Sequence, residues 1–275
     1  MTAARERTVP VRRVGPEGSR DDADVVAIEE PLELRVSGET LAVTMRTPGH
    51  DRELALGFLW SEGVIASLDD VSAMAHCGRP GTDGYGNTLE VTPAPGSRLV
   101  LPDERVRRGT IVTSACGVCG RRTVDDLLAR CTPVASDAAM TPAAMTRAVE
   151  SMRAMQPLFA VTGGCHGAGI ASLDGVVERV FEDVGRHNAV DKLVGSLLLE
   201  GRLPASRAAL VTTGRCGFEV AQKAIAAGIP VVLGVGAATS LAVETARRGA
   251  LTLAGFVRGG SMVVYAGAER VVTAR

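Results

Sequence analysis

The 275-residue sequence predicts an α/β protein with a layered core and a smaller β-rich part near its N-terminal end. From about residue 141 onward, short apolar runs alternate with segments of helical periodicity, a pattern typical of a layered domain with a largely parallel sheet. Several of the apolar runs end in Gly-rich turns. Aromatic residues make up only 3% of the chain, so the core must be packed from Ala, Val, Leu and close Gly contacts.

The first part of the chain predicts a tail, a hairpin and a helix. Residues 1–24 are rich in Gly, Pro, Arg and Asp, which predicts a disordered tail. Apolar residues alternate on both sides of Ser37-Gly38, as expected for two antiparallel strands. Residues 53–62 place apolar side chains on one helical face, and Gly63 is a suitable helix stop.

The next region leads to a pair of cysteines. Residues 78–97 contain eight Gly or Pro residues and predict a surface excursion. Residues 110–113 are apolar enough for a strand that enters the cysteine loop, and residues 124–129 predict a short helix with Thr123 as its N-cap. We therefore expect residues 25–140 to form an N-terminal region that carries a mobile Cys-Gly-Val-Cys-Gly loop.

The C-terminal half, residues 141–275, is expected to form the α/β cofactor-binding core. Thr141-Pro142 has the composition of a helix start, and this helix should continue to about residue 155. Asp174-Gly175 predicts a hairpin turn. The other expected strands are residues 158–162, 170–173, 176–182, 209–212, 231–235 and 251–254, and the other expected helices are residues 188–199, 218–227 and 240–248.

Charge and cysteine usage restrict the setting. The chain has 30 basic and 31 acidic residues, which argues against nonspecific binding to nucleic acid or to a membrane surface. No 18-residue apolar run occurs, and residues 1–24 lack the apolar stretch of a signal peptide. Six cysteines scattered through the chain do not resemble the disulfide framework of a secreted module. We therefore expect a cytoplasmic protein with reduced thiols.

The chemically most informative segment is the loop that contains Cys116 and Cys119. Four arginines flank it in the sequence, at positions 107, 108, 121 and 122. Nearby guanidinium charge stabilises a thiolate, and the thiolate is the form of cysteine that attacks, carries sulfur or binds metal. The segment therefore predicts a reactive thiol site.

Four Gly-rich loops follow or precede the expected strands of the core. Open α/β sheets bind ligands at such strand ends, and backbone N–H groups at a following helix N-terminus hold phosphate. Together the loops predict a site for a large polyanionic ligand. The loops are residues 162–167, 182–188, 212–217 and 255–261. The candidate binding residues within them are Gly185, Arg186, His187, Gly214, Arg215, Phe256, Val257, Arg258, Gly259, Gly260 and Ser261.

Other interpretations of the thiol pair remain open from the residues alone. A structural zinc site needs four ligands, so His76-Cys77 or Cys165-His166 would have to complete it. A deaminase-type catalytic zinc is disfavoured, because no His is followed by x-Glu and Ala115 stands where the Pro of that motif belongs. A thioredoxin-like redox pair shares the C-x-x-C spacing but belongs to a smaller fold.

An ordered set of motifs gives the chain a family resemblance. The chain resembles the FdhD family of formate dehydrogenase accessory sulfurtransferases. The matching segments are residues 30–32, 46–49, 53–59, 61–63, 116–120, 182–192, 218–223, 240–244 and 251–256.

The resemblance implies a protein that takes persulfide sulfur from a cysteine desulfurase. It would deliver this sulfur to the molybdenum bis(molybdopterin guanine dinucleotide) cofactor of the formate dehydrogenase catalytic subunit, with the cofactor as a bound substrate. It also implies Cys116 as the persulfide carrier, Cys119 as its partner, and cofactor contacts at residues 256–261.

The resemblance further implies a cytidine-deaminase-like core with a mixed sheet, a homodimer, and no tightly bound metal of its own. Cys165 and Cys216 lie outside the family signature and are given no part in sulfur relay. Two alternatives to a sulfurtransferase are a cofactor-binding chaperone that carries no sulfur and a zinc-stabilised C-x-x-C module.

Overall fold

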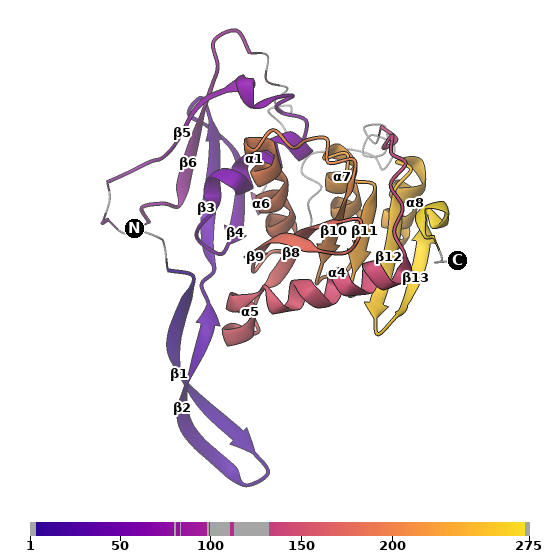
Figure 1. Ribbon diagram of the computed structural model, residues 1–275. Helices are drawn as coiled ribbons and strands as arrows, with labels where there is room; N and C mark the ends of the chain where they lie inside the picture. Colours follow the sequence, from indigo (N-terminus) through magenta and orange to yellow (C-terminus); the bar gives the residue numbers. More distant parts are fainter. Residues whose placement is uncertain are drawn as a thin grey trace.

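The computed structural model describes residues 4–79, 81–82, 84–97, 99 and 132–272, together with the backbone of residues 111–112. Figure 1 shows a helix-covered core, a second sheet beside it, and a two-stranded hairpin that projects away from both. Two short 3-10 helices, η1 (Leu68–Asp70) and η2 (Ala268–Arg270), complete the described elements.

The core contains a six-stranded mixed sheet in the order β13-β12-β11-β10-β8-β9. Its strands are β8 (His166–Ser172), β9 (Val177–Asp183), β10 (Ala208–Thr212), β11 (Val231–Gly234), β12 (Thr252–Arg258) and β13 (Ser261–Ala266). Only β10–β11 and β11–β12 pair in parallel, and the other three pairings are antiparallel. The expected mixed sheet is confirmed. The prediction of a largely parallel sheet is wrong, because β8 runs antiparallel to both β9 and β10, and β13 runs antiparallel to β12.

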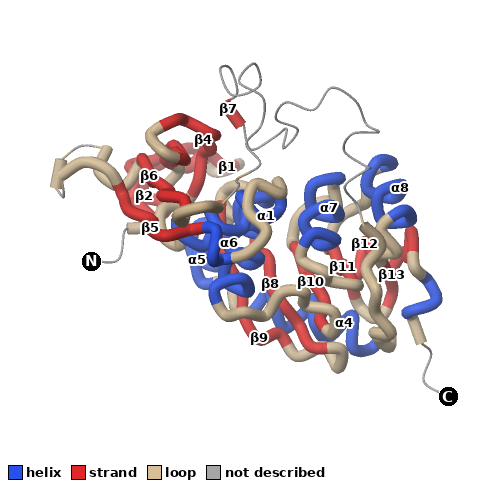
Figure 2. The backbone as a smooth tube through the Cα atoms, turned by 90° about the horizontal axis from the view of Figure 1, so that it is seen from above, coloured by secondary structure: helices blue, strands red, loops and turns tan. Residues whose placement is uncertain are grey.

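Helices cover both faces of this sheet (Figures 1 and 2). On one face lie α6 (Arg186–Leu199), α7 (Phe218–Ala226) and α8 (Ser240–Arg248), packed on buried side chains such as Leu210, Val232 and Leu253. On the other face, α4 (Pro142–Ala154) packs on Val211 and Leu233. Because both faces are covered, the central strands are apolar throughout.

The second sheet has the order β5-β6-β3-β4-β7 and packs on α1 (Asp51–Ser61). Its strands are β3 (Glu30–Val36), β4 (Glu39–Arg46), β5 (Val71–His76), β6 (Thr88–Pro93) and β7 (Ile111–Val112). The hairpin predicted around Ser37-Gly38 is confirmed as β3–β4, and the predicted helix is confirmed as α1. β6 lies inside the stretch predicted as a surface excursion, so that prediction is wrong for residues 88–93.

Two glycines allow α1 to pack on α6 with backbones in contact. A Cβ atom on Gly57 would lie 1.9 Å from the carbonyl oxygen of Asp191, and one on Gly195 would lie 1.8 Å from the carbonyl oxygen of Glu53. Neither distance is compatible with a side chain. The two glycines therefore set how closely the N-terminal sheet layer approaches the core.

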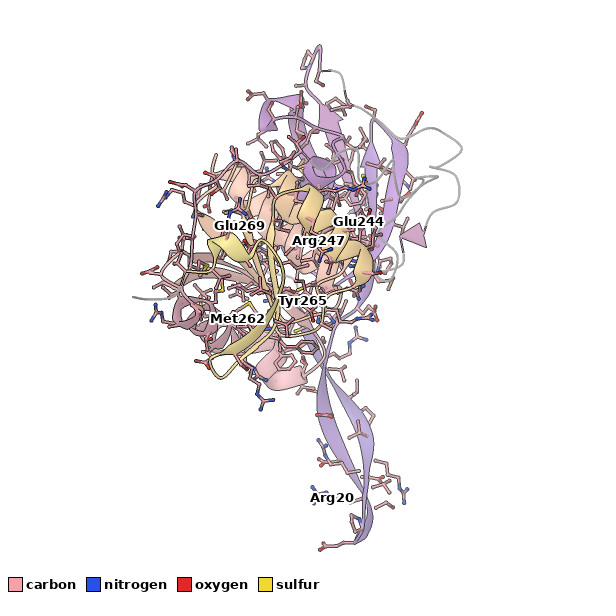
Figure 3. All side chains as sticks on the ribbon, turned by 90° about the vertical axis from the view of Figure 1, so that its right-hand side faces the viewer. Arg20, Glu244, Arg247, Met262, Tyr265 and Glu269 are labelled. Carbon is pink, nitrogen blue, oxygen red and sulfur yellow. The ribbon has the colours of Figure 1, made fainter. Side chains whose placement is uncertain are left out.

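Residues 6–27 form a hairpin rather than the predicted disordered tail. Strands β1 (Glu6–Gly15) and β2 (Gly18–Ala27) pair antiparallel over their full length across a Pro16-Glu17 turn. Opposite charges face each other across the ribbon, as for Arg13 and Asp22 at 2.7 Å. Polar composition concealed the period-2 pairing, because both faces of this ribbon are exposed. Figure 3 shows Arg20 near its far end, remote from Met262 and Tyr265 on β13.

One predicted strand is a helix. Residues 157–162 form α5 (Pro157–Thr162), with Pro157 at the first helical position and Gly163 left-handed at the end, at φ 62°. The predicted helix start at Thr141 is confirmed, since its hydroxyl accepts a hydrogen bond from the Ala144 N–H at 3.2 Å. Residues 132–140 run along the core, where the Val134 N–H donates to the Gly249 carbonyl, although the domain boundary was predicted after residue 140.

The predicted short helix at residues 124–129, the loop with Cys116 and Cys119, and the flanking arginines lie outside the described residues. No helix among the described residues is long and apolar enough to cross a membrane.

Candidate functional site

Five loops meet at one edge of the core sheet. The strands β9, β10, β11 and β12 all end at this edge, and β8 begins there because it runs antiparallel to β9 and β10. Four of these loops are the predicted ones, and the fifth, residues 235–239, follows β11. The edge between β9 and β12 spans four inter-strand spacings, about 19 Å. It is therefore long enough for an extended ligand.

Neighbouring loops contact one another directly. A Cβ atom on Gly214 would lie 3.3 Å from Cδ of Arg186 and 3.6 Å from Nδ1 of His166, so these three residues converge. The Gly236 N–H donates to the Gly214 carbonyl at 3.3 Å, and the Phe256 N–H donates to the Gly236 carbonyl at 3.2 Å. The loops thus form a continuous ledge from Arg186 to Phe256.

Two helices start at this ledge without side-chain caps. Gly185 precedes α6 and Gly217 precedes α7, and neither supplies a side chain to the first N–H groups. The start of α6 attracts anions through its free N–H groups and the helix dipole, whereas the first turn of α7 already contains the buried Glu219 carboxylate. Arg186, half-buried, and Arg215, exposed, add full positive charges at the same place. The ledge is therefore suited to phosphate groups.

His187 joins the starts of α6 and α7. Its Nε2 lies 2.9 Å from a carboxylate oxygen of Glu219, and both side chains are buried. Burial by itself raises the pKa of Glu219, but the contact with His187, the charge of Arg186 and the backbone outweigh it, so this pKa lies below its usual value. The contact holds the two helix starts together.

His166 lies at the beginning of β8, between the loops. Burial, followed by the charges of Arg186 and His187, lowers the pKa of its imidazole. At neutral pH this ring is therefore uncharged and can both donate and accept a hydrogen bond.

The last predicted Gly-rich loop, which includes residues 256–261, is a β-hairpin. Phe256, Val257 and Arg258 belong to β12, Gly259 and Gly260 form the turn, and Ser261 begins β13. Phe256 has a left-handed backbone, at φ 53°, and its ring is 51% exposed. A non-glycine residue rarely adopts this conformation, which concentrates at functional sites. The structure places this hairpin at the far end of the ledge from Arg186.

A cavity of about 420 Å³ extends the ledge toward α4 and α5. Its lining includes an exposed guanidinium, a neutral imidazole and a half-exposed aromatic ring. The lining residues are Arg153, Gln156, Phe159, Gly163, Gly164, Cys165, His166, Thr213 and Val235.

The thiols within the core are unsuited to nucleophilic chemistry. Burial, reinforced by the neighbouring Glu182 carboxylate, raises the pKa of Cys165 to about 12, and its Sγ donates to Glu182 at 3.6 Å. Burial also raises the pKa of Cys216 to about 12. Both thiols are therefore protonated at neutral pH, in keeping with their exclusion from sulfur relay.

Two of the predicted zinc ligands, His76 and Cys165, contact carboxylates in the structure. His76 lies 3.5 Å from the Asp51 carboxylate, and His166 faces Gly214. Among the described residues no three His, Cys, Asp or Glu side chains are placed so that they could hold a metal ion together.

The structure thus brings together Gly185, Arg186, His187, Gly214 and Arg215, and connects them to the residue 256–261 hairpin through a loop that sequence reasoning missed. A Gly-Val-Gly sequence directly after the apolar run of β11 was the available signal for that loop. Glu219 was also missed as part of the site, and Asp183, although it lies in the predicted loop at residues 182–188, was given no role, since nothing in their local sequence shows which atoms they contact.

The comparisons with known proteins point in one direction. The model of the FdhD/NarQ family matches residues 27–272. A protein of Anaeromyxobacter dehalogenans named "Sulfur carrier protein FdhD" is 50% identical over 257 residues, covering 90% of this chain and 88% of the relative. A Streptomyces coelicolor protein of the same name is 47% identical over 253 residues, covering 90% and 89%.

A solved structure shares the fold. The crystal structure of a protein from Desulfotalea psychrophila, described as a candidate formate dehydrogenase accessory protein, superposes with a TM-score of 0.76 at 24% identity, covering 98% of this chain and all of the other.

Proposed function

Because this chain belongs to the FdhD/NarQ family, we propose that it is a sulfur carrier that serves formate dehydrogenase. The relatives at about half identity bear the name of sulfur carrier proteins, and their similarity spans nearly the whole chain. In finer terms, we propose that the protein receives sulfur from a cysteine desulfurase on Cys116 and transfers it to a molybdenum bis(molybdopterin guanine dinucleotide) substrate.

The observation that carries the proposal is the ledge described above. A dinucleotide-bearing cofactor is long and polyanionic, and the ledge offers the uncapped start of α6, with Arg186 and Arg215 on the same ledge. Its extent of about 19 Å suits such a ligand better than a single phosphate. The ledge needs no resident metal in this role, since the molybdenum arrives as part of the substrate.

The thiol chemistry follows from general principles. A Cys116 thiolate attacks the outer sulfur of the donor persulfide, forming a Cys116 persulfide and releasing the donor thiolate. The outer sulfur then passes to the acceptor. In one version Cys119 attacks the Cys116 sulfur and expels sulfide, which leaves a disulfide that a dithiol must reduce. In the other version Cys119 only tunes the first thiol.

A pair of variants separates carrying from binding. Cys116→Ala is expected to abolish sulfur loading and to leave cofactor binding within twofold of wild type. Arg186→Gln combined with Arg215→Gln is expected to do the reverse, weakening binding at least tenfold because two charge-assisted contacts are lost. Mass spectrometry measures the loading, and equilibrium binding of the cofactor measures the affinity. Arg202→Gln combined with Arg207→Gln, in exposed ion pairs with Glu178 and Asp137, is the charge-matched control.

Other outcomes would favour the alternatives. If desulfurase treatment adds no sulfur to the wild-type protein while the cofactor still binds, the protein is a binding chaperone. If it purifies with about one zinc ion per chain and loses its fold on chelation, it is a zinc-stabilised module.

A further inference from the structure

We propose that Asp183 is a positioning residue, which holds the residue 184–187 turn of the ledge in register with the end of strand β4. The inference rests on the proposed function for what the turn binds, and on the contacts of Asp183 for how the turn is held. Asp183 is the last residue of β9 and is completely buried, so it lies beneath the ledge rather than on its surface.

Four donors converge on the two oxygens of this carboxylate. One oxygen, Oδ1, accepts from the Gly185 N–H at 2.8 Å and from Nδ2 of Asn188 at 3.0 Å. The other, Oδ2, accepts from the Thr47 N–H at 3.1 Å and lies 2.7 Å from Nζ of Lys192. One half of the carboxylate therefore holds the turn, and the other half holds the chain just beyond β4.

Only a carboxylate satisfies this arrangement. An ionised carboxylate accepts hydrogen bonds at both oxygens, whereas an amide has one oxygen and one NH₂ group that donates. An asparagine at position 183 would face either Thr47 or Gly185 with an N–H against an N–H. The buried Lys192 would also lose its counter-charge, and an uncompensated buried charge is strongly destabilising.

Further contacts strengthen the same junction. Nζ of Lys192 donates to the Thr47 carbonyl at 2.8 Å, and Oγ1 of Thr47 accepts from the Val184 N–H at 3.2 Å. From α6, Nδ2 of Asn188 also donates to the Met45 carbonyl at 2.7 Å. The turn and the end of β4 are thus joined by several buried hydrogen bonds, with Asp183 at their centre.

A side chain at position 185 would collide with the Asn188 side chain at this junction. A Cβ atom there would lie 2.8 Å from Nδ2 of Asn188 and 3.4 Å from Oδ1 of Asp183. The space that a side chain would need is occupied by the groups that bind Asp183. The glycine of this turn therefore leaves room for the hydrogen bond from Asn188 to Asp183.

The location of the anchor gives it a functional meaning. Strand β4 pairs in parallel with β7, with Thr44 opposite Val112, and residues 113–131 with both candidate thiols follow β7 in the sequence. Asp183 therefore fixes Arg186 and His187 relative to the strand pair from which the thiol segment departs. Sulfur transfer needs the carrier and the acceptor to meet in a defined geometry.

The test compares Asp183 with a second buried aspartate, Asp191. Asp191 is a buried carboxylate on α6 that pairs with Lys223 at 2.6 Å but does not bond the turn. The variants are Asp183→Asn alone and Asp183→Asn combined with Lys192→Met, which removes the unpaired charge. Asp191→Asn is the control, because it also leaves a buried lysine without its carboxylate partner. Amide hydrogen exchange at Val184 and Gly185 is measured against Leu210 on β10 as an internal reference. Sulfur loading of Cys116 is measured in parallel, together with sulfur delivery to formate dehydrogenase whose cofactor has not yet received sulfur.

Both Asp183 variants are expected to exchange at Val184 and Gly185 at least tenfold faster relative to Leu210. They should also deliver sulfur at least tenfold more slowly, while loading stays within twofold of wild type. Asp191→Asn should leave the relative exchange and the delivery within twofold. The proposal is overturned if the Asp183 variants keep the protection of the turn, or if Asp191→Asn loses protection and delivery equally. Should wild-type Cys116 accept no sulfur, the proposed function fails, and the exchange result still decides the role of Asp183.

Discussion

Single residues at the ledge act through buried charges. Glu219 and His187 connect the starts of two helices, and Asp183 connects a turn to a strand of the other sheet. Each of these carboxylates has a partner from another part of the fold: Nε2 of His187 lies 2.9 Å from Glu219, and the Thr47 N–H donates to Asp183. Their residue types could be read in the sequence, but their partners could not, because 32 residues separate His187 from Glu219 and 136 separate Thr47 from Asp183.

The Glu219 contact predicts a pH-dependent loss of stability. The pKa of Glu219 is lower in the folded protein than the usual glutamate value, so its ionised form stabilises the fold above pH 4.5. This contribution disappears as pH falls through the folded pKa. Glu219→Gln should therefore lower the free energy of unfolding by roughly 1 kcal/mol at pH 7. The gap from wild type should narrow as the pH falls below 4.5 and through the lower folded pKa.

Urea unfolding of both proteins between pH 3 and pH 8 measures this difference. Glu244→Gln is a suitable control, because Glu244 forms an exposed pair with Arg248 on α8. A Glu219→Gln deficit that stays constant down to pH 3 would contradict the assignment of an ionised Glu219 in the folded state.

At the scale of elements, local signals determined what the sequence could predict. The Thr141-Pro142 helix start and the turns at Ser37-Gly38 and Asp174-Gly175 are correct, because capping and turn residues act within a few positions. The prediction of a strand at residues 158–162 was wrong, since a short apolar segment fits a strand or a helix equally well. The β1–β2 ribbon was missed because it has no buried face to produce an apolar alternation.

The α1–α6 contact predicts a large effect of a very small substitution. Gly57→Ala or Gly195→Ala would place a methyl group within 2 Å of a backbone oxygen of the facing helix, so the helices must separate. Each substitution is expected to lower the free energy of unfolding by more than about 2 kcal/mol, despite the higher helix propensity of alanine. Thermal or urea unfolding measures the loss.

Gly15→Ala provides the control, because a Cβ atom there meets nothing within 4 Å. This variant should unfold within about 0.5 kcal/mol of wild type. Equal stability of Gly57→Ala and Gly15→Ala would show that the two helices do not rely on backbone contact.

At the scale of the molecule, the core and the N-terminal sheet each contribute a part of the proposed site. The core supplies a ledge with uncapped helix starts and arginines, and the N-terminal sheet carries β7, which precedes the thiol segment in the chain. The α/β class and most ledge loops were predictable, because glycines mark the strand ends. The antiparallel pairings of β8 with β10 and of β12 with β13 were not, since strand pairing depends on contacts between distant residues.

The central claim is that Cys116 carries transferable sulfur, and peptide mass mapping after treatment with a cysteine desulfurase and cysteine tests it most directly. Trypsin cleavage after Arg108 and Arg121 releases residues 109–121, which contain both thiols of the pair. The account predicts that this peptide gains about 32 Da, one sulfur atom, on Cys116, and that the gain is absent in Cys116→Ala and reversed by dithiothreitol. An unmodified peptide, or a sulfur adduct found on Cys77, Cys165 or Cys216 instead, would contradict the account.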